Sequence, residues 1–239
     1  MEQLSTEEVF VLKARIKFRK YGAMKFIGHL DIMRFFQKVM RRAEVPIAFT
    51  GGYSPHMIMS FANPLGVGVT SDGEYFDIEL AEEIDMQEAV ARMNQVMVEG
   101  IEVVNMVQIS DEKKRTGMSI VAAADYLSTL RHGEFPENWK EKAEGFMDQE
   151  EITILKKTKK SEKETNIKPM IYKFGIQDDA VYMQVATGSV ENLKPEVVMQ
   201  AFCQYLGMDI EEIAFAHHRL DVFAMDEEKH EFVSLDKVW

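Results

Sequence analysis

Apolar and basic residues alternate along residues 11–19, which predicts a half-buried strand with a largely basic outer face. Residues 29–43 and 85–98 instead repeat their apolar positions with a helical period, so we predict two amphipathic helices. Further strands are predicted at 57–61, 74–80 and 101–109. The resulting order, β-α-β-β-α-β, is the ferredoxin-like arrangement.

The second half repeats this order with one additional strand. Two helices are predicted, at 136–148 and 194–206. The strands are predicted at 118–126, 151–155, 171–177, 181–187 and 213–223. We therefore expect an α+β fold of two tandem ferredoxin-like units, which occupy residues 11–109 and 118–239, with an N-terminal extension at 1–10 and a linker at 110–117. The pattern leaves open that the two halves merge into one continuous sheet.

The composition narrows the class of protein. The chain has 239 residues, of which 46% are hydrophobic and 28% charged, so it can bury a sizeable core. Its single cysteine, Cys203, excludes an internal disulfide, a four-cysteine zinc site and an iron–sulfur cluster held by this chain alone. No stretch approaches ~18 consecutive apolar residues, and residues 1–10 are acidic. We expect a cytoplasmic protein with no membrane partner, no metal and no cofactor.

Charge is spread unevenly along the chain. The net charge is −12, but residues 11–69 carry ten Lys/Arg against two acids, which gives +8. Residues 70–239 carry 18 Lys/Arg against 35 acids, which gives −17. A basic block inside an acidic protein indicates either a positive surface for an anionic partner or a face that is balanced by acids from elsewhere in the fold.

The residues suited to binding a polyanion gather in this basic block. The Gly51–Gly52 pair lets the backbone approach a ligand closely, and Tyr53 offers a stacking face for a base. We expect six cations to contact phosphates, namely Arg15, Lys17, Arg19, Arg34, Arg41 and Arg42. The remaining members of the predicted RNA-binding set are Ser54, His56 and Ser60.

Four residues of the same region are candidates for a polar or catalytic pocket: His29, Asp31, His56 and Glu74. His29 lies at the start of a predicted helix, where free N–H groups attract anions. His29 and His56 could serve as general acid and base in RNA cleavage. The chain has no Walker loop and no nucleophile elbow, and a His-x-Asp with a distant histidine is a loose metal pattern. The residues therefore favour binding over independent catalysis.

Residues 26–74 also contain a recognisable series of short motifs. These are His29-Leu30-Asp31, Arg34, Arg41-Arg42-Ala43, Gly52–His56, Ser60-Phe61, Pro64-Leu65, Gly68, Ser71 and Glu74. The series resembles the radical-SAM-linked protein family. Residues 217–223 resemble the C-terminal arginine strand of that family, and residues 166–172 resemble a segment that usually begins with aspartate, where this chain has Asn166.

That family is a domain of unknown function, found alone or fused behind radical SAM enzymes with cobalamin-type binding domains. The resemblance implies a radical SAM enzyme as a partner. Because this chain lacks the three-cysteine cluster motif, it cannot perform radical SAM chemistry itself.

We therefore expect a non-catalytic accessory protein of a radical SAM enzyme, which binds a structured RNA such as tRNA through a basic N-terminal face. One alternative is a nuclease-like RNA-processing enzyme that uses His29 and His56. Another is a protein-interaction module that docks on a radical SAM enzyme without RNA, because the strongly acidic remainder of the chain repels nucleic acid.

Overall fold

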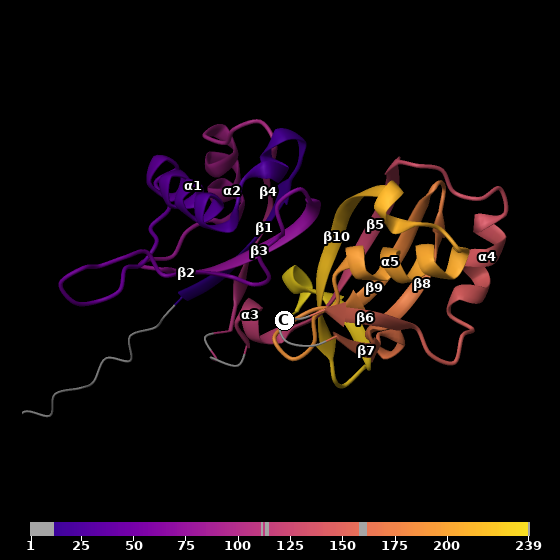
Figure 1. Ribbon diagram of the computed structural model, residues 1–239. Coiled ribbons are helices and arrows are strands. Elements are labelled where there is room, and N and C mark those ends of the chain that lie inside the picture. Colours follow the sequence, from indigo (N-terminus) through magenta and orange to yellow (C-terminus); the bar gives the residue numbers. More distant parts are fainter. Residues whose placement is uncertain (1–11, 111, 113–114, 158–161, 239) are drawn as a thin grey trace, which may run out of the picture.

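The chain folds as a mixed α+β protein built on one large, mostly antiparallel sheet (Figure 1). The computed structural model describes residues 12–110, 112, 115–157 and 162–238. The predicted extension at 1–10 lies outside these residues. None of the helices in the described residues is long and apolar enough to cross a membrane.

The first half carries two helices on one face of its strands. Its strands are β1 (Leu12–Lys20), β2 (Met59–Phe61), β3 (Thr70–Leu80) and β4 (Ile101–Ile109), and its helices are α1 (His29–Arg42) and α2 (Met86–Gln95), with a 3₁₀ turn, η1, at Gly22–Phe26. All its strand pairs are antiparallel, in the order β4-β1-β3-β2. Asp85 accepts a hydrogen bond from the Glu88 N–H and so begins α2, as its side chain is suited to do.

The core of this half lies between the helices and the sheet. The apolar positions of β1 form one wall of it, because Leu12, Ala14, Ile16 and Phe18 are all buried there. Phe36 of α1 packs edge-on against Phe18, with ring centroids 4.7 Å apart. The alternation read from the sequence therefore places the apolar side of β1 correctly.

The second half contains the remaining strands and helices of the described residues. Its strands are β5 (Val121–His132), β6 (Thr153–Lys157), β7 (Glu162–Asn166), β8 (Ile171–Gln177), β9 (Ala180–Ala186), β10 (Ala214–Asp226) and β11 (Glu231–Ser234). Its helical elements are α3 (Gly117–Ile120), α4 (Trp139–Phe146), α5 (Pro195–Leu206) and the 3₁₀ turns η3 (Lys168–Met170), η4 (Ile210–Glu212) and η5 (Leu235–Lys237). Helices α4 and α5 cover the core of this half.

One nine-stranded sheet runs through both halves, in the order β4-β1-β3-β10-β5-β9-β8 with β2 and β11 attached at the side. The halves meet where β10 pairs with β3 in parallel, through His218 with Thr70 and Arg219 with Ser71. Figure 1 shows the halves side by side on either side of this junction. Of the two possibilities that the sequence left open, the continuous sheet is therefore the one formed, while the predicted domain bounds stay a prediction.

Three details differ from the predicted elements. Residues 118–120 belong to the helical turn α3 and the strand begins at Val121. The hairpin β6–β7 forms a separate two-stranded sheet, so β7 adds a strand that the sequence pattern did not show. The last four-residue strand, β11, pairs with the end of β10 and was also missed, because a strand this short has almost no period to detect.

Candidate ligand site at the junction of the halves

The basic face of β1 points into the molecule. Arg15 has 1% of its surface exposed. Its Nε lies 2.7 Å from Asp77 Oδ1 and its second terminal nitrogen 3.0 Å from Asp77 Oδ2, while it also donates to the carbonyls of Leu235 and Arg115. We predicted that Arg15 contacts phosphate. That prediction is wrong, because the guanidinium is buried and its hydrogen bonds go to groups of the protein itself.

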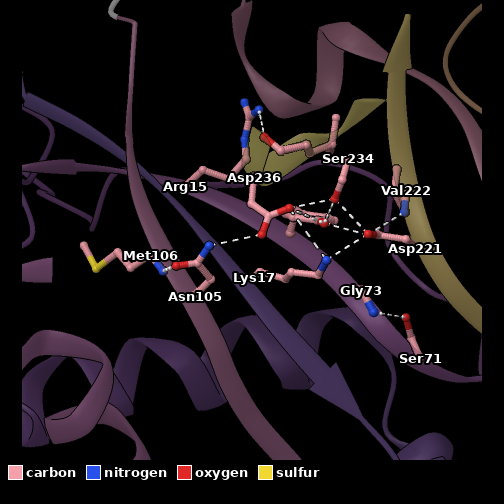
Figure 2. Close-up of polar contacts among 12 residues, drawn as sticks. Arg15, Lys17, Ser71, Gly73, Asn105, Met106, Asp221, Val222, Ser234 and Asp236 are labelled. Carbon is pink, nitrogen blue, oxygen red and sulfur yellow. Dashed lines mark hydrogen bonds and ion pairs between the residues drawn. The ribbon is translucent and has the colours of Figure 1, made fainter. Parts of the chain in front are cut away.

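Lys17 is also engaged within the protein, in the polar cluster that Figure 2 shows. Its Nζ lies 2.8 Å from Asp221 Oδ2 and 3.6 Å from Asp236 Oδ1. Ser234 Oγ contacts both carboxylates, at 2.7 and 2.6 Å, and Tyr75 contacts Asp221 at 2.5 Å. The predicted phosphate contact of Lys17 is also wrong, because its ammonium group is paired with Asp221 and Asp236.

The cluster also sets the ionisation of its members. Burial acts to raise the pKa of Asp236, but hydrogen bonds from Ser234 and Asn105 and the charge of Lys17 hold that pKa below its usual value. Burial and the neighbouring Asp221 carboxylate raise the pKa of Tyr75, so its hydroxyl stays protonated and donates. The cluster therefore joins β1, β3 and β10 as an internal link between the halves.

Arg19 lies nearer the surface but is paired as well. Its Nε lies 2.8 Å from Asp72 Oδ1, and a terminal nitrogen lies 3.5 Å from Glu102 Oε2. The hydrogen bond to Asp72 is the main reason that the pKa of Arg19 is raised. Much of the positive charge of β1 is therefore balanced by acids from elsewhere in the fold.

The cations of α1 are placed differently. Arg34, Lys38, Arg41 and Arg42 are all exposed. Arg34 contacts Asp31 at 3.3 Å, within the helix. In the part of the chain that the structure describes, Lys38, Arg41 and Arg42 form no ion pair. The outward positive charge of the first half is therefore concentrated on α1.

Residues 50–56 form an exposed loop that projects from the first half on the side away from the second half (Figure 1). Gly51, Gly52, Tyr53 and Ser54 lie along it, and Tyr53 is fully exposed. His56 closes the loop, since its Nδ1 lies 3.0 Å from Thr50 Oγ1. These residues are accessible to a partner, but they are not part of the junction.

A cavity of about 390 Å³ lies at the junction instead. It is lined by α1, β2, the segment that follows β2, α3 and the segment that follows β9. Its polar lining residues are His29, Ser60, Asn63 and Ser189, and its large apolar ones are Met33, Met59, Phe61 and Met118. The His29 ring stands edge-on to Phe61, with centroids 5.0 Å apart, and burial lowers the pKa of His29, which favours the neutral imidazole.

A smaller hollow of about 110 Å³ adjoins the cavity and shares Asn63 and Pro64 with it. On the far side it is lined by Tyr126, by Arg219 and by the first residues of α5. Lys194 and Glu196 are the charged residues of that helix end. The two spaces together form one groove between the halves.

Three buried charges lie beneath the groove. Arg219, 3% exposed, contacts Glu74 Oε1 at 3.0 Å, the Asn63 carbonyl at 2.9 Å and the Tyr126 hydroxyl at 3.0 Å. Lys20, 2% exposed, donates to the Ile27 carbonyl at 2.8 Å. Burial raises the pKa of Glu74 and lowers that of Lys20, and in each case the opposite charge across the site counteracts part of the shift.

The structure brings some of the predicted pocket residues together and separates others. His29 and Ser60 line the cavity, and Glu74 lies beneath it. Asp31 is exposed and pairs with Arg34, and His56 lies in the 50–56 loop rather than among the lining residues. His29 and His56 therefore do not line the same cavity. No group of three or more His, Cys, Asp or Glu within the described residues is arranged to hold a metal.

Sequence reasoning missed three residues of the junction: Lys20, Asn63 and Arg219. Lys20 lies on the same side of β1 as the apolar residues Ile16 and Phe18. A lysine on that side of the strand indicates a buried charge. Arg219 lies on the same side of β10 as His217, and both side chains are buried. Asn63 contributes a backbone carbonyl, and no sequence pattern shows that role.

Comparison with known proteins gives a family and distantly similar solved structures. A protein-family profile described as "Uncharacterized protein conserved in bacteria (DUF2344)" matches residues 13–195. No curated protein matches this chain. A chain in the "Crystal Structure of a Cbf5-Nop10-Gar1 Complex" is similar with a TM-score of 0.46 and 13% identity, over 90% of this chain and 50% of that one. This chain thus spans about half the length of that chain.

Proposed function

The chain belongs to the DUF2344 family of uncharacterised bacterial proteins, and we propose that it binds a structured RNA, such as tRNA, without catalysing a reaction on it. The observation that carries this proposal is the row of exposed cations on α1. Residues 34, 38, 41 and 42 lie at helical spacings of four, seven and eight, so they share one face over about 12 Å of helix. Arginine at such a face suits bidentate contact with phosphate.

The cations of β1 and α1 differ in their surroundings, and this difference supports α1 as the RNA-binding element. The cations of β1 are paired inside the molecule, so they offer little to an external polyanion. Those of α1 are exposed in an otherwise acidic protein, so they are where an anionic partner meets the least repulsion. Tyr53 and His56, on the loop that follows α1 along the chain, supply accessible rings for stacking on unpaired bases.

The proposal includes an interpretation of the fold. We interpret each half as a ferredoxin-like unit, on the strand orders β4-β1-β3-β2 and β10-β5-β9-β8. The second unit then carries the β6–β7 hairpin as an insertion and β11 as an extension. In this interpretation the RNA-binding helix α1 is the first helix of the first unit.

The partner in this proposal is a radical SAM enzyme, and the support for it is the resemblance of the motif series between Phe26 and Glu74. The enzyme supplies the cluster chemistry, for which this chain has no cysteine set, and the present chain holds the RNA. Co-purification of the two proteins from a bacterium that encodes both, before and after nuclease treatment, tests this part separately. Absence of the enzyme in both preparations contradicts it.

Fluorescence anisotropy with labelled bulk tRNA across a salt series tests the RNA proposal. We expect tight binding at 50 mM salt that weakens by about 10² on going to 200 mM salt, for a site with four phosphate contacts. Arg41→Glu/Arg42→Glu should weaken binding at least about tenfold and flatten the salt dependence.

A matched control distinguishes the loss of the α1 cations from a general change in the net charge of the protein. Arg131→Glu/Lys142→Glu makes the same change in charge at exposed positions of the second half. It should leave affinity within about threefold of wild type at physiological salt. If both variants lose the same RNA affinity, or if wild type does not bind RNA at low salt, the RNA proposal is wrong. The protein-docking alternative then remains.

A further inference from the structure

We infer that the groove between the halves binds one nucleotide, with its base in the 390 Å³ cavity and its phosphate in the adjoining hollow beside Arg219. The inference deepens the proposed function and rests on it, since the nucleotide is taken to be an unpaired residue of the bound RNA. A free nucleotide and a nucleotide within an RNA strand both present a nucleoside monophosphate to the groove.

The charged groups around the hollow favour an anion. Arg219 is buried beside it and Lys194 lines it, while Lys20 lies beneath it. Glu74 acts on both Arg219 and Lys20, and Glu196 lines the hollow as the opposing carboxylate. A phosphate in the hollow would lie beside Arg219 and Lys194.

Arg219 has donors left for this purpose. Its Nε donates to Tyr126, and one terminal nitrogen donates to Glu74 and to the Asn63 carbonyl. Among the described residues the hydrogen bonds of Arg219 come from its Nε and Nη1, and the residue lines the hollow with its Nη2 not engaged. A guanidinium with a free NH₂ group beside a hollow of this size suits a phosphate oxygen.

The first turn of α5 lines the same hollow. Pro195, its first residue, has no N–H, and the Val197 and Val198 N–H groups donate to the Lys194 carbonyl. The attraction for an anion at this helix end therefore comes from the side chain of Lys194. Glu196, which also lines the hollow, acts against an anion, so its charge tunes the affinity of the site.

The cavity suits a base. Phe61 and three methionines give it apolar walls, and His29, Ser60, Asn63 and Ser189 offer hydrogen-bonding groups at its edges. Its volume, about 390 Å³, falls in the range of small-molecule sites. An unpaired RNA base is recognised by such a combination of apolar contact and edge hydrogen bonds.

The position of α1 connects this cavity to the RNA surface. His29, which lines the cavity, is the first residue of α1, and the exposed cations follow further along the same helix. His29 and Met33 lie on the side of α1 opposite the exposed cations, so a strand on the basic face reaches the cavity by passing around the beginning of the helix. One nucleotide turned out of the strand can enter the groove there.

Calorimetric titration with the four nucleoside 5′-monophosphates tests the site directly, and the parent nucleosides test its phosphate half. We expect a monophosphate to bind at least about tenfold more tightly than its nucleoside, since charge-assisted bonds to phosphate are lost in the latter. Ser189→Trp, which fills the cavity from an exposed segment, should abolish binding, whereas Val190→Trp, at an exposed neighbour outside the lining, should not.

Glu196→Gln provides a variant that improves the site. Removing this charge should tighten monophosphate binding by about two- to fivefold, the range of a single exposed ionic interaction, and should leave nucleoside binding unchanged. A monophosphate affinity that this variant does not raise, or a nucleoside that binds equally well, overturns the placement of the phosphate.

RNA with 2-aminopurine at a loop position distinguishes the two sources of nucleotide. Unstacking into the cavity should raise its fluorescence in wild type and Val190→Trp, but not in Ser189→Trp. RNA binding without a fluorescence change and without monophosphate binding overturns this inference and leaves the proposed function standing. Monophosphate binding without RNA binding overturns the proposed function and assigns the groove to a free nucleotide.

Discussion

Arg15 and Asp77 stand opposite each other on the neighbouring strands β1 and β3, and their side chains form a two-pronged ion pair with N–O distances of 2.7 and 3.0 Å. Asp77 also accepts the backbone N–H of Gly117 at 2.7 Å. The pair therefore ties the first half to the beginning of the second. A strand that looks basic and outward in sequence is in fact the inner wall of the junction.

Loss of this pair should be costly. Arg15→Met leaves Asp77 buried without its guanidinium, so we expect the free energy of unfolding to fall by about 3–5 kcal/mol. Urea denaturation monitored by circular dichroism measures it. Arg34→Met, at an exposed pair on α1, should change the same quantity by no more than about 1 kcal/mol. An Arg15 variant as stable as wild type would contradict the structural role of the pair.

Gly73 should not tolerate a side chain. A Cβ at this position would overlap Asp221 Oδ1 and lie 2.8 Å from the Asp221 Cα, so backbone as well as side chain must move. We expect Gly73→Ala to lower the free energy of unfolding by about 1–3 kcal/mol, the range of overpacked sites. Gly175→Ala on β8 is the control, because its Cβ would meet nothing within 4 Å. Similar urea midpoints for the two variants would refute the close approach.

His217 should make stability depend on pH. Burial lowers its pKa despite an opposing effect of Glu196, and Ser128 Oγ lies 2.8 Å from its Nδ1. The unfolded histidine titrates near pH 6.5. Below that pH the unfolded chain binds a proton that the native protein does not, so the free energy of unfolding falls as pH drops from about 7.

Urea midpoints at pH 7.5, 6.5 and 5.5 measure this dependence. His217→Gln has no titrating group at that position, so its midpoint should fall less than that of wild type over the same interval. Parallel curves for the two proteins would show that His217 is not the source.

Cys203 should be chemically silent in the native protein. Burial raises the pKa of its thiol to about 11. At pH 8 only about one thiol in a thousand is then ionised, and alkylation needs the thiolate. Iodoacetamide followed by mass spectrometry should show no modification of the native protein within an hour and full modification in 6–8 M urea, a commonly used denaturing range. Rapid native alkylation would contradict the buried position.

The sequence predicts the local elements of this fold well where periodicity is long. The helix predicted at 29–43 is α1 at His29–Arg42, and the strand predicted at 11–19 is β1 at Leu12–Lys20. The helix predicted at 194–206 is α5 at Pro195–Leu206. These features depend on neighbours along the chain, so the chain itself displays them.

The candidate site is less predictable because it depends on distant partners. Arg15 and Arg42 are equally basic in sequence, yet one meets Asp77 across a sheet and the other meets solvent. Arg219 reaches Glu74 across 145 residues of sequence, and periodicity gives no sign of that pairing. Periodicity tells which side of a strand a residue occupies, but not what covers that side.

The single parallel contact between β3 and β10 has a consequence for synthesis on the ribosome. Thr70 and His218 are 148 residues apart, so at about 5–20 residues per second β10 emerges roughly 7–30 seconds after β3. Through that interval the hydrogen-bonding edge of β3 that β10 will occupy stays open, and Lys17 of β1 lacks its acids Asp221 on β10 and Asp236 on η5. The edge of β3 is therefore open to wrong pairing throughout this interval, and the arrival of β10 covers it.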